Sequence, residues 1–363
     1  MPALQSTNPN PTTDEAPSPG AVSPVAATRP APTAMDRLRS IYRSPGPYTT
    51  VYLATRPLLP HAERDLSERW QEMRAELETQ CAPLDALEAI DARLALPDPD
   101  DTAGVCVIAA ADGSTVVEYG MEPPRVDVGV IDTLPHVGPM LEWQQRRVPH
   151  LVVTADRFGA DIVTFGADHF SDLDTIEGDA TIIAPIVSTT ATAIGARLVV
   201  VGGDPATAQS LADELTTVTA PWCHVVACLD ENVDQLADTT VRHVSDAAAR
   251  TTVGYLRELR FLATHDAGID GTDDTIAALV SGVPGVLLVH DDPTDDRRIW
   301  IGKAPFQLSQ DKNTECREQA RLVDAAIWSA VLQGMDVHII PTTGHTGPDD
   351  NTAIIDRGAP APS

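Results

Sequence analysis

The segments PGPYTTVYLATRP at residues 45–57 and AERDLSERWQEMR at residues 62–74 decide how the fold begins. In the first segment, β-branched and aromatic side chains alternate from Tyr48 to Leu53, a pattern typical of a strand. In the second, apolar side chains recur at the three- and four-residue spacing of one helix face, and these are Leu66, Trp70, Met73 and Leu77. The two patterns predict a strand at 48–53 followed by a helix at 62–79.

The same region differs in charge from the rest of the chain. The 363 residues include 25 Lys and Arg against 53 Asp and Glu, which gives a formal net charge of −28. Residues 35–75 instead hold seven Arg against five acidic residues, a local balance of +2. A basic cluster in an acidic protein predicts a surface for an anionic partner.

Short motifs along most of residues 37–357 resemble the bacterial relatives of the archaeal and eukaryotic class 1 peptide-chain release factor. This group includes an actinobacterial branch related to the ribosome-hibernation factor Balon. The motifs are Gly46-Pro47 with Val51-Tyr52, Ala62-Glu63-Arg64 with Arg69-Trp70 and then Arg74, the stretch 153–165, the Val-Val-Val-Gly-Gly strand end at 199–203, and the final GPDDNTAIIDR at 347–357.

The resemblance implies an α/β protein with a three-domain release-factor-like architecture. Residues 1–34 are rich in Pro, Ala and Thr without apolar periodicity, so we expect a disordered tail. An α/β N-terminal domain is expected at 35–147. A ribonuclease-H-like middle domain at 148–245, without a Gly-Gly-Gln loop, and an L7Ae-like α/β/α C-terminal domain at 246–363 are implied by the family.

Local patterns predict further elements inside these domains. Asp112-Gly113 between two apolar runs predicts a hairpin, and 151–155 with 160–165 predicts a second one. Pro205 after the buried strand that ends at Gly203 predicts a helix start. The remaining expectations are helices at 84–95, 245–264, 272–281 and 315–333 and strands at 224–229, 286–289, 298–301, 337–341 and 352–356.

The resemblance also shows what this chain lacks. In the termination factors, a Gly-Gly-Gln loop of the middle domain helps to hydrolyse peptidyl-tRNA. Here the one Gly-Gly pair, Gly202-Gly203, is followed by Asp204, and the stretch 172–196, where such a loop would lie, has no Gly-Gln step. The Asn-Ile-Lys-Ser stop-codon motif is missing too. We therefore expect no peptide release by that mechanism and no enzymatic activity.

Two alternatives from other functional classes stay open. A ribonuclease-H-like fold cleaves phosphodiesters when carboxylates converge on Mg²⁺, and the candidates for a nuclease or peptidyl-tRNA hydrolase are Asp156, Asp161 and Asp204. Asp156 also suits a turn and Asp204 suits a helix N-cap. The second alternative is a stress-induced protein whose acidic surface binds a protein partner.

No cofactor or metal site is indicated. The five cysteines are odd in number and scattered, which argues against a disulfide framework. The spacing of Cys223, His224 and Cys228 differs from that of the usual zinc sites, and the pattern of this segment is typical of a buried strand. Residues 1–34 lack the basic start and apolar run of a secretory signal, and no apolar run is long enough to cross a bilayer, so we expect a cytoplasmic protein without membrane contact.

The preferred interpretation is a ribosome-associated, release-factor-like protein that acts in dormancy or stress. Its partners would be rRNA at the A-site and an elongation-type GTPase, and not DNA. The predicted contacts to RNA phosphates, which would weaken with salt, are Arg37, Arg39, Arg43, Arg56, Arg64, Arg69, Arg74, Arg146 and Arg147. The alternative for these arginines is a solvated face held in ion pairs.

Overall fold

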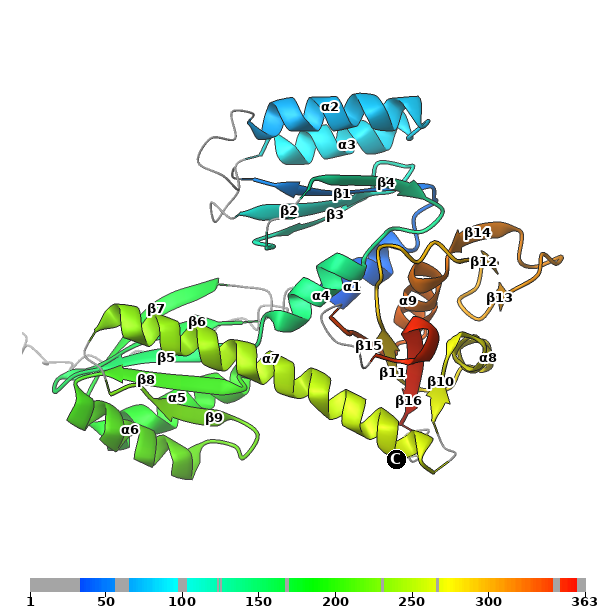
Figure 1. The fold of residues 1–363 in the computed structure, drawn as a ribbon. Helices are drawn as coiled ribbons and strands as arrows, with labels where there is room; N and C mark the ends of the chain where they lie inside the picture. The colour runs from blue at the N-terminus through cyan, green and yellow to red at the C-terminus, as the bar shows by residue number, and fades with distance from the viewer. Residues whose placement is uncertain are drawn as a thin grey trace, which may run out of the picture. The chain divides into compact units, whose positions relative to one another are not determined.

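The computed structural model describes residues 33–55, 65–96, 103–122, 124, 126–166, 170–229, 232–265, 268–341 and 347–357. These residues form a mixed α/β structure with four sheets (Figure 1). Within them, no helix has the length and apolar character that crossing a bilayer requires.

The N-terminal sheet is antiparallel, with strand order β3-β2-β1-β4. Its elements are β1 (Tyr48–Ala54), β2 (Gly104–Ala109), β3 (Thr115–Tyr119) and β4 (Val128–Asp132), with the helices α2 (Leu66–Thr79) and α3 (Leu84–Leu94). The two helices cover one face of the sheet, where Trp70 and Leu77 pack with Val51 and Leu53 (Figure 1). The predicted hairpin at Asp112-Gly113 is confirmed by the pairing of β2 with β3.

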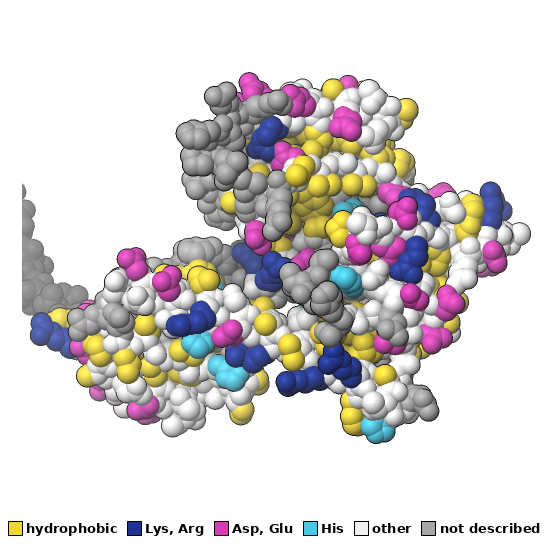
Figure 2. Space-filling view, in the orientation of Figure 1, with side chains coloured by type: hydrophobic (Ala, Val, Ile, Leu, Met, Phe, Trp, Pro, Cys, Tyr) yellow, Lys and Arg dark blue, Asp and Glu magenta, His cyan; other side chains and the backbone are white. Residues whose placement is uncertain are grey.

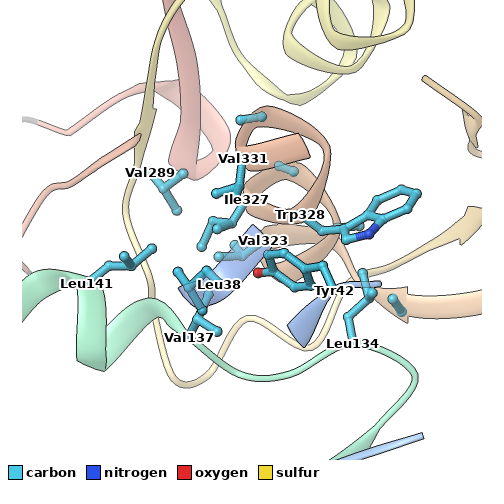
Figure 3. Close-up of a cluster of buried hydrophobic side chains, with 14 of the residues drawn as sticks. Leu38, Tyr42, Leu134, Val137, Leu141, Val289, Val323, Ile327, Trp328 and Val331 are labelled. Atoms are coloured by element: carbon cyan, nitrogen blue, oxygen red, sulfur yellow. The ribbon is translucent and has the colours of Figure 1, made fainter. Parts of the chain in front are cut away.

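The opposite face of this sheet is also buried. Tyr48 and Tyr52 point into a core that includes α1 (Ala34–Ile41), α4 (Gly138–Arg146) and α9 (Leu322–Leu332). Figure 3 shows Leu38 and Tyr42 against Val323, Ile327 and Trp328 of α9. Alternating side chains of β1 therefore serve two separate cores, which explains why every residue of the strand is buried.

The middle sheet has the order β7-β6-β5-β8-β9. Its elements are β5 (His150–Ala155), β6 (Gly159–Phe165), β7 (Phe170–Glu177), α5 (Ala180–Ala193), β8 (Leu198–Gly203), α6 (Pro205–Val218), β9 (His224–Ala227) and α7 (Val233–Ala263). Strands β5 to β7 are antiparallel, whereas β8 and β9 run parallel to β5. A three-stranded meander extended by two parallel strands is the topology expected of a ribonuclease-H-like sheet.

The C-terminal sheet has the order β10-β16-β11-β15, and a smaller sheet has the order β13-β12-β14. The elements are β10 (Ile269–Asp270), α8 (Thr272–Ser281), β11 (Gly285–Val289), β12 (Arg298–Ile301), β13 (Leu308–Ser309), β14 (Glu318–Arg321), β15 (Asp336–Ile339), η1 (Asp349–Asn351) and β16 (Thr352–Asp356). Residues of α9 pack on one face of the main sheet, and Leu259 of α7 packs on the other with Val286 and Leu288. The sheet lies between helices, as predicted.

Two predicted helices have different bounds. The helix expected at 315–333 is wrong in its first part, because residues 318–321 pair with β12 as a strand and α9 starts only at Leu322. The helix expected at 245–264 is the second half of α7, which begins at Val233. The domain boundary expected between 245 and 246 thus falls inside one continuous helix, and the division into three domains stays a prediction.

Candidate functional site

Most of the predicted RNA-binding arginines that the structure describes are held by carboxylates. The Arg37 Nε atom donates to Oε1 of the nearly buried Glu118 at 2.8 Å. Arg69 pairs with Asp127 and also donates to the carbonyl of Ala54. Because Asp127 in turn accepts from the Ala54 amide at 2.9 Å, Arg69 stabilises the end of β1.

Three further arginines lie in exposed or half-exposed ion pairs. Arg74 pairs with Glu78 one turn along α2, and its Nε lies 3.1 Å from the carboxylate of Asp91 on α3. Arg39 lies 3.0 Å from Asp36. Arg146 pairs with Glu142 and with Glu122. The alternative interpretation, a face held in ion pairs, describes these side chains.

Two predicted arginines have no carboxylate partner among the described residues. Arg43 is exposed, and its side chain has no hydrogen-bond or ion-pair partner among the described residues. The guanidinium of Arg147 lies 4.8 Å from the ring centroid of Trp143, a cation–π geometry that leaves its N–H groups available. Arg56 and Arg64 lie outside the described residues. The visible face in Figure 2 has Lys and Arg as separate spots among Asp and Glu, without one continuous basic patch.

The three carboxylates considered for a nuclease each have a local role. Asp156 accepts hydrogen bonds from the amides of Phe158 and Gly159, at 2.7 and 3.0 Å, and so shapes the turn between β5 and β6. Asp161 accepts from the Thr175 hydroxyl across the hairpin at 2.8 Å. Asp204 caps α6 by accepting from the amide of Thr207 at 2.9 Å. Within the described residues, no three His, Cys, Asp or Glu side chains group as a metal site would require.

The Gly202-Gly203 pair has a packing role. Gly203 has a φ of +103°, and a Cβ added there would lie 2.2 Å from the carbonyl oxygen of Ala155 on the neighbouring strand. A Cβ on Gly202 would lie 2.8 Å from the side chain of Leu236 on α7. The pair therefore permits close approach of β5 and α7 to β8, which requires glycine on steric grounds.

An ionic cluster missed by the sequence analysis joins the N-terminal sheet to α9. His136 follows β4, and its Nδ1 lies 3.4 Å from the carboxylate of Asp324, while its Nε2 lies 3.9 Å from Asp291. The Arg321 guanidinium lies 2.6 Å from Asp291 and 3.8 Å from Asp324. The same guanidinium donates to the backbone carbonyls of Asp292 and Asp295, at 2.7 and 2.9 Å.

Burial and charge shift the titration of this cluster. Burial alone would lower the pKa of His136, but the hydrogen bond to Asp324 and the attraction of Asp324 and Asp291 outweigh it and raise the pKa. Burial raises the pKa of the Asp324 carboxyl above its usual range, against the opposing effect of His136 and Arg321. The Asp291 and Asp324 carboxylates lie close to the Arg321 guanidinium and the His136 imidazole, and buried carboxylates need such partners.

Three members of this cluster, His136, Arg321 and Asp324, line a cavity of about 550 Å³. The walls include Trp143 and Met121 and the valines 105, 128 and 130, and the polar lining includes Tyr52, Glu122 and Glu142. The described lining residues include no Ser, Thr or Cys that could act as a nucleophile. The cluster is therefore chemically suited to hold elements together and to exchange a proton with its surroundings.

The sequence carries a weak signal for this cluster. Asp324 is the one charged residue in the run from Leu322 to Leu332 on α9, and ten of the eleven positions of that helix are buried. A lone carboxylate in an apolar helix must find a partner. The partners come from segments far apart in the chain, so the sequence alone does not name them.

No protein-family model matches this chain. Two curated sequences from Mycobacterium tuberculosis, the uncharacterized proteins MT2704 (strain CDC 1551 / Oshkosh) and Rv2629 (strain ATCC 25618 / H37Rv), are each 26% identical over 132 residues. Each match covers 35% of this chain and about a third, 34%, of the relative's length.

Several solved structures of archaeal and eukaryotic termination-type factors align with most of the chain. Archaeal translation termination factor aRF1 has 17% identity and a TM-score of 0.25 over 89% of this chain and 97% of its own. A model of ribosome-bound archaeal Pelota and ABCE1 has 11% identity and a TM-score of 0.43 over 90% and 95%. S. cerevisiae Dom34, described as interacting with Hbs1, has 9% identity and a TM-score of 0.38 over 71% and 81%. Because all three TM-scores are below 0.5, the function proposed below depends on the residues of this chain.

Proposed function

We propose that this protein is a ribosome-associated factor of the release-factor type, from the bacterial branch related to Balon. It occupies the A-site in dormancy or stress and does not hydrolyse peptidyl-tRNA. The observation that carries the proposal is the short connection between β7 and α5 in a ribonuclease-H-like sheet. β7 ends at Glu177 and α5 begins at Ala180, so two residues span the place where the family's hydrolytic loop would lie.

Hydrogen bonds hold this connection close to the sheet. The amide of Gly178 donates to the carbonyl of Phe158 at 3.0 Å. Asp179 caps α5 by accepting from the amides of Thr181 and Ile182, at 3.0 and 3.3 Å. A two-residue turn bonded at both ends cannot extend into a catalytic centre, which supports a role that depends on occupancy and not on catalysis.

Arginines without a carboxylate partner support the RNA contact. Arg43 and Arg147 keep N–H groups available, and such groups position a protein on phosphates without reading sequence. Arg56 and Arg64 remain part of the proposal. Arg37 and Arg69 are assigned a structural role here, because their partners are largely buried.

Co-sedimentation tests the proposal. Tagged full-length protein is added to lysates of starved and growing cells, and its distribution across a sucrose gradient is compared with that of the double variant Arg43→Glu/Arg147→Glu. We expect wild-type protein in the 70S fractions and the variant mostly at the top. Arg242→Glu, on the exposed face of α7, is the matched control.

Two further readouts separate the alternatives. Purified ribosomes carrying peptidyl-tRNA should release no peptide when the protein is added, and rRNA should stay intact with Mg²⁺ or with EDTA. Peptide release would favour the hydrolase, and EDTA-sensitive RNA cleavage would favour the nuclease. Absence from 70S fractions at every salt concentration would contradict the proposed function and favour a protein partner. Delivery by an elongation-type GTPase is tested by adding such a GTPase with GTP.

A further inference from the structure

A second cavity, of about 350 Å³, lies between the end of α1, the edge strand β3 and the end of α3. Its lining is rich in hydrogen-bond donors. The described residues around it include Arg37, Ser40, Ser44, Arg93, Ser114 and Thr115. Two arginines and four residues with a hydroxyl group thus line one small cavity.

Arg93 makes one side-chain hydrogen bond among the described residues, and this bond leaves its terminal N–H groups available. It lies in the last turn of α3, and its Nε donates to the hydroxyl of Thr115 at 3.1 Å. Among the described residues, neither Nη atom has a hydrogen-bond or ion-pair partner. An arginine held through Nε presents its two terminal amino groups as a fork, the geometry that suits two oxygens of a phosphate.

The hydroxyl groups of the cavity are likewise unused. The side chains of Ser40, Ser44 and Ser114 have no hydrogen-bond partner among the described residues. By contrast, the backbone acceptors nearby are occupied. The carbonyl of Ser44 accepts from the Tyr48 hydroxyl at 2.6 Å, and the carbonyl of Ile41 accepts from the Ser44 amide at 2.9 Å. The cavity therefore offers donors in excess of acceptors.

The carboxylates near the cavity do not cancel this excess. Glu118 accepts from Arg37 through Oε1 and its side chain is only 9% exposed. Asp112 accepts from the amide of Ser114 at 2.9 Å and shapes the β2–β3 turn. The Arg37–Glu118 pair is neutral as a unit, whereas no carboxylate among the described residues pairs with Arg93, and the exposed Arg43 lies between Ser40 and Ser44 in the chain.

We propose that this cavity is a phosphate-binding site, in which the Nη groups of Arg93 and the hydroxyls of Ser40, Ser44 and Ser114 bind phosphate oxygens. The phosphate can come from an RNA backbone or from a free phosphate compound. If the site binds ribosomal RNA, this inference rests on the function proposed above. Binding of phosphate itself does not rest on that function.

Equilibrium binding of inorganic phosphate to the full chain tests the site directly. Loss of a charge-assisted, bidentate contact should weaken binding about tenfold in Arg93→Gln. The matched control is Arg242→Gln, which removes an exposed helical arginine that also donates to a threonine hydroxyl. Ser40→Asp, which places a carboxylate at the cavity, should abolish binding, and unfolding curves establish that each variant folds.

A short fluorescent oligouridylate distinguishes the two sources of phosphate. If Arg93→Gln weakens both phosphate and oligouridylate, the site takes an RNA backbone, and if only phosphate is weakened it takes a free phosphate compound. Equal phosphate affinity in wild type, Arg93→Gln and Ser40→Asp would overturn the proposal. If phosphate binding depends on Arg93 but the protein does not bind 70S particles, the phosphate site is supported and the proposed function is contradicted.

Discussion

His136 lies in a cluster of charged side chains that joins the N-terminal sheet to α9. Its imidazole lies between Asp324 and Asp291, with Arg321 Nη1 3.3 Å from its Nδ1. The hydroxyl of Tyr52 on β1 donates to the carbonyl of His136 at 2.6 Å. One residue thus connects the first strand of the N-terminal sheet to the first turn of α9.

The stability of the protein should therefore fall at alkaline pH. The pKa of His136 is raised in the folded chain, above about 6.5 in the unfolded chain. Its stabilising contribution is complete below about pH 6.5 and is lost as pH rises through the folded pKa. We expect His136→Gln to cost about 3 kcal/mol of unfolding free energy at pH 6, with a difference from wild type that narrows toward pH 9. Urea unfolding at several pH values measures the difference in unfolding free energy between wild type and His136→Gln. A difference that does not change with pH would contradict the prediction.

Gly138 is required by the same cluster. A Cβ added there would lie 1.8 Å from Oδ2 of Asp291, so Gly138→Ala must displace that carboxylate from Arg321 and His136. We expect a loss of about 3 kcal/mol in unfolding free energy. Gly254→Ala in α7, where an added Cβ meets no atom within 4 Å, is the control and should stabilise by up to about 1 kcal/mol. Equal changes in unfolding free energy for Gly138→Ala and Gly254→Ala would show that the Asp291 carboxylate can move without cost.

Among the elements, those with a strong local pattern were predictable. The strand from Tyr48, the helices α3, α6 and α8 and the two hairpins have clear periodicity, caps or turn residues, and the structure confirms them. β4, β7 and α4 were not expected. β4 alternates weakly and, in the part of the chain that the structure describes, pairs with β1 alone. α4 has no side-chain N-cap, so tertiary contacts decide both elements.

The candidate sites were harder to predict than the elements. The arginine positions were visible, but their carboxylate partners, such as Glu118 for Arg37 and Asp127 for Arg69, come from distant segments. The helix expected from residue 315 shows the same limit, because residues 318–321 form a strand only through their pairing with β12. Local sequence does not encode which distant segment completes such a pair.

Asp204 offers a test at the scale of one helix. If it is the N-cap of α6, with a pKa lowered chiefly by the hydrogen bond from the Thr207 hydroxyl, Asp204→Ala should lower the midpoint of thermal unfolding. Asp204→Asn should stay close to wild type, since asparagine caps equally well. Both results should be the same with Mg²⁺ or EDTA. A midpoint that responds to Mg²⁺ in wild type alone would instead make Asp204 a metal ligand.

For the whole molecule, the net charge of −28 opposes association with another polyanion at long range. Because carboxylates hold Arg37, Arg39, Arg69, Arg74 and Arg146, few arginines remain for phosphates. With about five phosphate contacts, from Arg43, Arg56, Arg64, Arg93 and Arg147, the slope of log affinity against log salt should be about −4. Filter binding to ribosomes between low and moderate salt measures it, and a slope of about −6 or steeper would imply that the ion-paired arginines are released for RNA.

The most direct test of ribosomal A-site occupancy is competition on purified vacant 70S ribosomes. Fluorescently labelled full-length protein is titrated onto particles whose A-site is either empty or filled with tRNA. We predict saturable binding to the empty particles and its loss when tRNA fills the A-site. Binding that is unaffected by A-site tRNA, or no binding to either particle, would contradict the account.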